Sequence, residues 1–235
     1  TTEGEVDFDS LDKVVEHLIA GGVNGLFTLG SSGEVAYLTD AQRDAVTART
    51  VATAAGRVPV LVGAIETTAK RVIDRALRAQ ELGADAIVAA GPFYALPSAA
   101  EVADHFRAIH AAIDLPLFAY DVPVRLGGLK LGRDMLVELG KEGVIVGVKD
   151  SSGDDVGFRR LVAANEAAGH PSSSSPVTRS SSMVPTCPER TEACPAWPTW
   201  TPRATCASGR RTSAATGRPC APSRTDSRTS CASSR

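Results

Sequence analysis

The sequence predicts an α/β fold built on a parallel sheet. Five short apolar runs begin between 26 and 33 residues apart, and helical patterns lie between them. The runs are almost continuously apolar, as in parallel strands that are covered on both faces. An open doubly wound sheet and a (β/α)8 barrel both fit this alternation. The predicted strands are Gly25–Leu29, Val58–Val62, Ala84–Ala90, Leu115–Tyr120 and Val144–Lys149.

Helix signals fill the segments around these runs. The first is an apolar stripe at helical spacing from Leu11 to Ile19, which two glycines end. Two later helices begin with the pattern of a capping box, at Thr39 and at Ser98. Further helices are predicted over Ala69–Leu82 and Phe158–Ala168. No strand is followed by a G-x-G-x-x-G or Walker motif, which disfavours the nucleotide-binding form of the open sheet.

The composition changes after residue 170. Residues 1–170 carry 24 acidic and 16 basic side chains, whereas residues 171–235 carry nine Arg and three acids. The second segment is rich in Ser, Thr and Pro and contains no Leu, Ile, Phe or Tyr. Such a segment buries too little apolar surface to offset the entropy of ordering it. The sequence therefore predicts a folded domain over 1–170 and a disordered tail over 171–235.

Several classes of protein are disfavoured by the whole chain. The net charge of −2 gives no general attraction to nucleic acid or to anionic membranes. No apolar run reaches the roughly 18 residues of a membrane-spanning helix, and no signal peptide is visible. All five Cys lie in the tail without a C-x-x-C pair, so neither a metal site nor a disulfide framework is expected. A cytoplasmic protein is predicted.

Polar residues follow three of the predicted strands. The turn Gly30–Glu34 offers two hydroxyls and exposed backbone N–H groups, which suit a carboxylate. Tyr94 and Tyr120 stand at the ends of the third and fourth strands, and Arg125 follows a proline turn. Each has a simpler interpretation as a turn, a packing residue or a surface charge. In a barrel, however, the carboxyl ends of the strands carry the active site.

Lys149 is the strongest single signal. It ends an otherwise apolar strand, where an ammonium group is costly to desolvate. Burial lowers the pKa of such an amine and makes it a nucleophile for ketones and aldehydes. The alternative is that the side chain extends past the end of the strand into solvent. The position favours Schiff-base chemistry.

Four motifs in order resemble the dihydrodipicolinate synthase and N-acetylneuraminate lyase family of class I aldolases. They are G-S-S-G-E, G-P-F-Y, Y-D-V-P-x-R and G-V-K-D-S-S-G-D. Their spacing also agrees, with 63 residues from Ser31 to Tyr94, 26 to Tyr120 and 29 to Lys149. The resemblance covers residues 1 to about 170. It implies a (β/α)8 barrel, which is usually a homotetramer.

The resemblance implies a role for each matched residue. Lys149 forms the Schiff base with pyruvate or another 2-oxo acid, and Tyr120 relays protons. Ser31 links Tyr120 to Tyr94, which reaches toward a neighbouring subunit's site. Ser32 and nearby amides hold the carboxylate of the 2-oxo acid, in a turn shaped by Gly30 and Gly33. No metal and no organic cofactor is implied, because the lysine activates the substrate itself.

The second substrate is left open by the same motifs. Arg125 favours an acidic aldehyde, as in the synthases, because it would bind the carboxylate of the aldehyde. Asp121 stands where the family usually has Asn, and Ser31-Ser32 where Thr-Thr is commoner. Sugar-acid lyases and hydratase-aldolases of the same family share the Lys and the Tyr. They are the alternative within the enzyme class.

The two ends of the chain depart from the family pattern. The predicted runs correspond to strands two to six, so the first strand and the last two are expected to be missing. When the tail is back-translated with GC-rich codons and the reading frame is shifted by one base, it gives Val-Val-Val-Leu-Thr-Gly-His-Glu and, later, a Gly-rich sequence. These resemble the last two strands of the family. A frameshift near Pro171 is therefore one hypothesis, and a genuine basic tail is the other. Without the last two strands, Lys149 would lie beside an open edge of the sheet. A non-catalytic remnant is therefore the alternative to an active enzyme.

Overall fold

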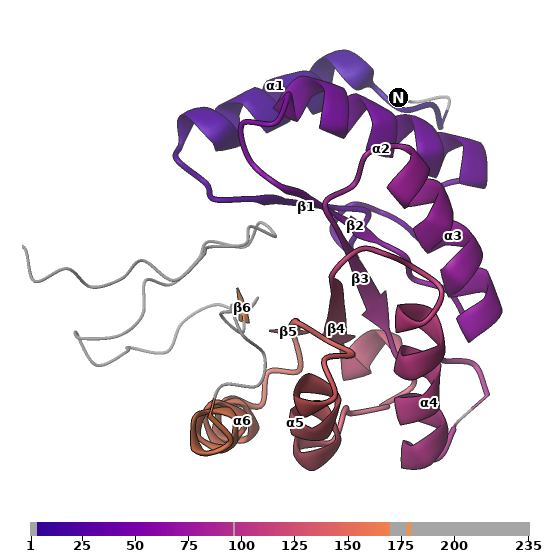
Figure 1. Ribbon diagram of the computed structural model, residues 1–235. Coiled ribbons are helices and arrows are strands. Elements are labelled where there is room, and N and C mark those ends of the chain that lie inside the picture. The colour runs from indigo at the N-terminus through magenta and orange to yellow at the C-terminus, as the bar shows by residue number, and fades with distance from the viewer. Residues whose placement is uncertain (1–3, 96, 170–177, 180–235) are drawn as a thin grey trace, which may run out of the picture. The chain divides into compact units, whose positions relative to one another are not determined.

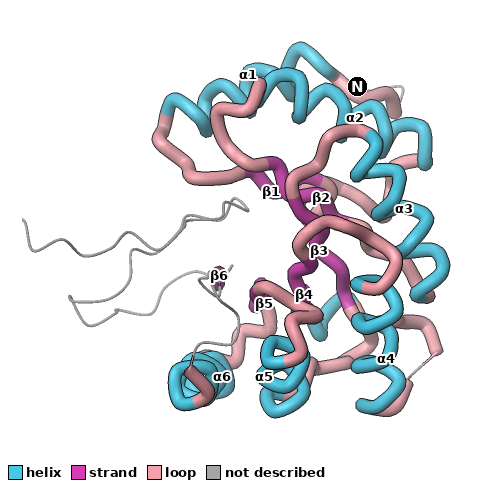
Figure 2. The backbone as a smooth tube through the Cα atoms, viewed as in Figure 1, coloured by secondary structure: helices cyan, strands magenta, loops and turns pink. Residues whose placement is uncertain are grey.

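The structure is a computed structural model that describes residues 4–95, 97–169 and 178–179. All of them belong to one unit of the chain. The boundary predicted between residues 170 and 171 falls outside the described residues, as does most of the tail. Helices and strands alternate along the chain (Figures 1 and 2). The elements are α1 Phe8–Ala20, β1 Leu26–Thr28, α2 Asp40–Ala54, β2 Val60–Gly63, α3 Ala69–Glu81, β3 Ala86–Ala90, α4 Ala99–His110, β4 Leu117–Asp121, the 3-10 helix η1 Pro123–Arg125, α5 Arg133–Lys141, β5 Gly147–Asp150, α6 Asp155–Ala167 and β6 Thr178–Arg179.

The strands form one parallel sheet whose order in space is their order in the sequence, from β1 to β6. Each of the connections between neighbouring strands contains a helix, which is the usual form of the crossover that parallel neighbours require. Consecutive order with a helix between neighbouring strands is the topology of a (β/α)8 barrel rather than of a doubly wound sheet. The fold is therefore an incomplete (β/α)8 barrel.

The sheet is apolar on both faces. One face packs on the helices through a large core that contains Val60, Ile87, Leu117 and Phe106. The opposite face carries a smaller cluster that includes Phe27, Leu61, Phe118 and Tyr120. Because side chains alternate along a strand, Asp121 must point to the helix side when Tyr120 points to the inner side.

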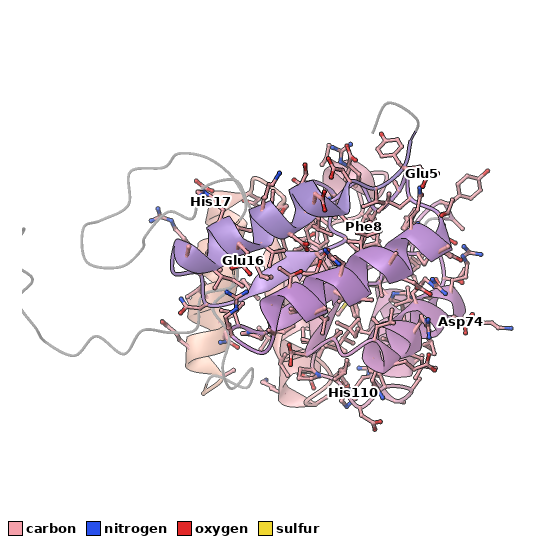
Figure 3. All side chains as sticks on the ribbon, turned by 90° about the horizontal axis from the view of Figure 1, so that it is seen from above. Glu5, Phe8, Glu16, His17, Asp74 and His110 are labelled. Atoms are coloured by element: carbon pink, nitrogen blue, oxygen red, sulfur yellow. The ribbon has the colours of Figure 1, made fainter. Side chains whose placement is uncertain are left out.

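Side-chain caps explain where the helices begin. Thr39 and Ser98 both form complete capping boxes, with Gln42 and Glu101 as their partners, as the sequence predicts. Asp7 caps α1 by accepting from the backbone N–H of Ser10. Ion pairs then join consecutive helices. In Figure 3, α1 and α2 lie side by side, and Glu16 of α1 pairs at 2.6 Å with Arg57, which follows α2.

All five predicted strands have somewhat different limits in the structure, and hydrogen bonds or backbone conformation explain two of the differences. The last apolar run begins at Val144, but β5 begins only at Gly147. The N–H groups of Val144 and Ile145 donate to the carbonyl of Leu139, at 2.9 and 3.4 Å, so these residues close α5 before they can join the sheet. At the other end of the sheet, β1 stops at Thr28 because Leu29 adopts a left-handed φ of 56°.

A sixth strand corrects the expectation that Lys149 lies beside an open edge. Thr178 and Arg179 form β6, which pairs in parallel with Lys149 and Asp150. The sequence showed no strand signal here, since neither residue belongs to an apolar run. An unpaired strand edge offers backbone N–H and C=O groups that any extended segment can bond, whatever its side chains.

The described helices include none that is both long and apolar enough to cross a membrane.

Candidate active site

Lys149 and Tyr120 lie together at the carboxyl ends of β5 and β4. The two residues are direct partners in the parallel register. Both are buried, with 9% of Lys149 and 4% of Tyr120 exposed. The Lys149 Nζ atom lies 3.8 Å from the centre of the Tyr120 ring. A buried amine thus stands against an acid–base group at the end of the sheet where barrel enzymes react.

The surroundings move both groups toward the states that Schiff-base chemistry needs. Burial lowers the pKa of Lys149, more than the neighbouring Tyr120 and Asp150 raise it. For Tyr120, burial by itself would raise the pKa of the phenol. The charge of Lys149 and hydrogen bonds from Ser31, Lys149 and Ser151 outweigh burial, so the pKa of Tyr120 is lowered. The amine therefore loses its proton more readily than a surface lysine, and the phenol loses its proton more readily than a free tyrosine.

Ser31 reaches the site from the turn after β1. Its Oγ atom lies 3.4 Å from the Tyr120 hydroxyl, across 89 residues of sequence. Within the turn, the N–H groups of Gly33 and Val35 donate to the Gly30 carbonyl, and that of Glu34 donates to Ser31. Of the N–H groups that the sequence analysis expected this turn to expose, those of Gly33 and Glu34 are therefore used within the turn. Within the described residues, the amides of Gly30, Ser31 and Ser32 are the ones in this turn that have no hydrogen-bond acceptor.

Gly30 allows a close approach of the Phe27 ring. A Cβ atom on Gly30 would lie 2.8 Å from Cε1 of Phe27. The same ring meets Tyr120 edge-on, with centroids 6.1 Å apart, and lies 5.6 Å from the Lys149 Nζ atom. The absence of a side chain at Gly30 thus sets where the ring packs against both site residues.

The substitution Gly30→Ala is expected to destabilise the protein by about 1–3 kcal/mol, because the new methyl group overpacks Phe27. Chemical denaturation followed by circular dichroism measures this change. In a Phe27→Leu background the smaller side chain leaves room, so the same substitution should cost less. Equal costs in both backgrounds would contradict the proposed clash.

Ser151 is a site residue that the sequence analysis did not assign. Its Oγ atom accepts a hydrogen bond from the Lys149 Nζ atom at 2.9 Å. Its backbone N–H donates to the carbonyl of Asp121 at 2.7 Å and so extends the pairing of β4 and β5. Residues two apart on an extended chain share a face. That periodicity, counted on from Lys149, is the signal that would have found it.

A buried charge cluster lies behind the site, on the helix side of the sheet. Lys130 forms a short ion pair with Asp121 and also contacts Asp150 at 3.4 Å and Ser152 at 2.9 Å. The two carboxylates are 1% and 4% exposed, and they directly follow Tyr120 and Lys149. Asp121 also accepts from the N–H of Leu131 at 3.2 Å. Lys130 thus supplies the positive charge that a buried Asp needs where the family usually has Asn.

Three predicted site residues lie outside the group of side chains that surrounds Lys149 and Tyr120. Tyr94 is 97% exposed, has a strained φ of 80°, and forms no hydrogen bond with Ser31 in the described part of the chain. Arg125 lies in η1 with its side chain exposed and without an ion pair among residues 4–95 and 97–169. Ser32 is exposed as well. The roles assigned to these residues stay predictions.

The described residues contain no group of three or more His, Cys, Asp or Glu that could hold a metal ion. The five Cys lie outside them. The expectation that the reaction needs neither metal nor organic cofactor stays a prediction, carried by the chemistry of Lys149 rather than by this observation.

Known proteins match the chain over the same region. The model of the Dihydrodipicolinate synthetase family matches residues 1–167. A 4-hydroxy-tetrahydrodipicolinate synthase of Phenylobacterium zucineum (strain HLK1) is 40% identical over 165 residues, which are 69% of this chain and 56% of that protein. The corresponding protein of Staphylococcus carnosus (strain TM300) is 35% identical over 153 residues, 65% of this chain and 52% of its own length.

Solved structures of the family superpose on the described fold. The chloride-inhibited dihydrodipicolinate synthase from Acinetobacter baumannii, complexed with pyruvate, matches with a TM-score of 0.68 and 32% identity, over 72% of this chain and 57% of that one. A prophage protein of the same family from E. coli K12, also in complex with pyruvate, gives a TM-score of 0.69 and 31% identity over the same shares. The chain spans about half the length of the curated relatives it matches. With its motifs, its strand order and these matches together, the chain belongs to the dihydrodipicolinate synthetase family.

Proposed function

We propose that the protein is a lysine Schiff-base aldolase or lyase that joins pyruvate, or another 2-oxo acid, to an aldehyde in the manner of 4-hydroxy-tetrahydrodipicolinate synthase. The observation that carries this proposal is the buried Lys149 amine, 3.8 Å from the Tyr120 ring. Relatives that share the fold are complexed with pyruvate. A buried amine of lowered pKa is the nucleophile that ketone chemistry requires.

The geometry suggests how the first steps run. The neutral Lys149 amine attacks the ketone carbon of the 2-oxo acid, and Tyr120 donates a proton to the oxygen that becomes the carbinolamine hydroxyl. Tyr120, reprotonated by the proton that the nitrogen loses, protonates that hydroxyl, which leaves as water and gives the protonated imine. The Tyr120 phenolate then takes a proton from the adjacent carbon, which gives the enamine that adds to the aldehyde. Ser31, at 3.4 Å from Tyr120, hydrogen-bonds to the phenol and orients it for these proton transfers.

The turn after β1 and Arg125 bind the substrates in this proposal. The amides and hydroxyls of Ser31 and Ser32 receive the carboxylate of the 2-oxo acid, since these N–H groups have no acceptor in the described residues. Arg125 binds an acidic aldehyde from its exposed position after β4. The exposed Tyr94 contributes to the site of a neighbouring subunit in a cytoplasmic homotetramer.

Trapping with borohydride tests the reaction. The purified chain is incubated with pyruvate and reduced, and its intact mass and the modified peptide are determined. One reduced pyruvate on Lys149 is expected, none on Lys149→Met, and normal labelling on Lys70→Met, which changes an exposed lysine of α3. A wild-type chain that folds but takes up no pyruvate would identify it as a non-catalytic remnant. A panel of aldehydes, assayed with pyruvate and the unreduced enzyme, then separates a synthase from a sugar-acid lyase or a hydratase-aldolase.

A further inference from the structure

We propose that Ser151 is a further catalytic residue, which carries a proton between Lys149 and Tyr120 while the imine forms. This inference deepens the proposed function and rests on it. Ser151 touches the reacting nitrogen itself, because its Oγ atom accepts from Lys149 Nζ at 2.9 Å. Ser31, the other hydroxyl of the site, contacts the phenol of Tyr120.

Ser151 is held in place by the backbone of the sheet. Its N–H donates to the Asp121 carbonyl at 2.7 Å, one residue beyond the last paired residues of β4 and β5. Asp121 and Asp150 are themselves tied together by Lys130. The Ser151 hydroxyl thus stands on a fixed backbone rather than on a free loop, and its position relative to Lys149 is set before substrate arrives.

The next residue, Ser152, provides a natural contrast. Its N–H and its hydroxyl both donate to Oδ1 of Asp150 at 2.7 Å, and its hydroxyl accepts from Lys130. Ser152 therefore belongs to the charge cluster behind the sheet, whereas Ser151 belongs to the reacting face. Two adjacent serines of similar exposure thus have different neighbours, and only one of them contacts the amine.

The proton balance of the step is closed within these residues. When the Lys149 nitrogen bonds to the ketone carbon, it becomes positively charged and must lose one proton. Ser151 accepts that proton from nitrogen while its own hydroxyl proton passes to the Tyr120 oxygen. Tyr120 passes its original proton to the ketone oxygen, which becomes the carbinolamine hydroxyl. One N–H bond is replaced by one O–H bond on the substrate, and both relay residues return to their starting state.

Two hydrogen bonds of Ser151 give the role a distinctive pH signature. A hydrogen bond from the ammonium to Ser151 favours the charged amine, so its loss lowers the pKa of Lys149. A hydrogen bond from Ser151 to Tyr120 helps to lower the pKa of the phenol, so its loss raises that pKa. The other charged group that acts on this pair is Asp150 beside Lys149, and Asp150 is itself paired with Lys130.

The test measures the rate of borohydride-trapped pyruvate adduct in single turnover, from acid to alkaline pH. Ser151→Ala is expected to slow trapping by about 10²-fold, which is the lower end of the range for a lost proton-transfer group. The pH profile of its trapping rate should also widen, with the acid limb at lower pH and the alkaline limb at higher pH. Ser151→Thr keeps the hydroxyl and should recover most of the rate. Ser152→Ala, the matched control, should leave both limbs in place.

The outcomes separate this inference from the proposed function. A wild-type chain without any adduct contradicts the Schiff-base proposal itself. A wild-type chain that is trapped, with Ser151→Ala equally fast at every pH, overturns only the role of Ser151. Equal losses in Ser151→Ala and Ser152→Ala with unshifted limbs would show a structural effect and would overturn it too.

Discussion

Lys130→Met is expected to lower the free energy of unfolding by about 3 kcal/mol at neutral pH. The substitution keeps most of the apolar stem but leaves the carboxylates of Asp121 and Asp150 without their cation, and these are only 1% and 4% exposed. Breaking a buried ion pair from one side typically costs about 3–5 kcal/mol. The lower end applies because the Lys130 side chain is itself 38% exposed, so water screens part of the interaction.

The loss should shrink in acid. Burial raises the pKa of Asp121 above its ordinary value of 3.8, although Lys130 and the Leu131 N–H act against it. At pH values between the pKa of Asp121 in the unfolded state and its higher pKa in the folded state, the native protein binds more protons than the unfolded chain. Asp121 therefore adds stability as the pH falls through this range. Without Lys130 the folded pKa rises further. The difference between variant and wild type should therefore be largest near neutrality and smaller toward pH 4.

Urea denaturation at several pH values measures both effects. The double variant Asp121→Asn/Lys130→Met removes one carboxylate together with the cation, so it should recover a large part of the loss. Asp121→Asn alone should cost less than Lys130→Met, because it leaves Lys130 beside Asp150. Additive costs in this cycle would show that Asp121 and Lys130 do not depend on each other.

Tyr120→Phe is expected to slow formation of the trapped adduct by about 10²- to 10³-fold, since general acid–base groups typically contribute 10²–10⁴-fold. The ring and its contacts with Phe27 and Lys149 remain, so the fold should be retained. Only the hydroxyl is lost, and with it the hydrogen bonds to Ser31, Lys149 and Ser151.

The pH profile of this variant checks the electrostatic argument. Tyr120 raises the pKa of Lys149 through its charge and its hydrogen bond, against the larger effect of burial. Without the hydroxyl the pKa of Lys149 falls further, so the neutral amine persists to lower pH and the acid limb should shift in that direction. Ser31→Ala, which keeps Tyr120, should slow trapping less. An unchanged rate for Tyr120→Phe would exclude the phenol from the chemistry.

Much of the site was predictable because it depends on strand ends. An apolar run that ends in Lys149, and the tyrosine at the end of the preceding run, both needed only the rule that parallel strands end at one edge of the sheet. The capping boxes at Thr39 and Ser98 were likewise local patterns, and the structure confirms them. Local patterns and strand alternation are the parts of this fold that the amino-acid order determines directly.

The features that were missed depend on the path of a loop. Lys130 follows η1, and its contact with Asp121 and Asp150 exists only because that loop returns over the ends of two strands. The limit of β5 at Gly147 depends on hydrogen bonds from Val144 and Ile145 back to α5, although both residues are apolar and β-branched. The pairing of β6 depends on an available strand edge rather than on its own residues. None of these is visible without the tertiary structure.

The consecutive order of the strands also has a consequence during synthesis. Ser31 leaves the ribosome 118 residues before Lys149, which is on the order of 10 s at ~5–20 residues per second. During that interval β1 to β4 can pair one after another, each on the edge left by the last. The inner apolar face, which contains Phe27, Leu61 and Phe118, is then present before β5 has been synthesised. A nascent chain halted in this interval would present that face to chaperones, and Lys149 and Ser151 would be the last parts of the site to arrive.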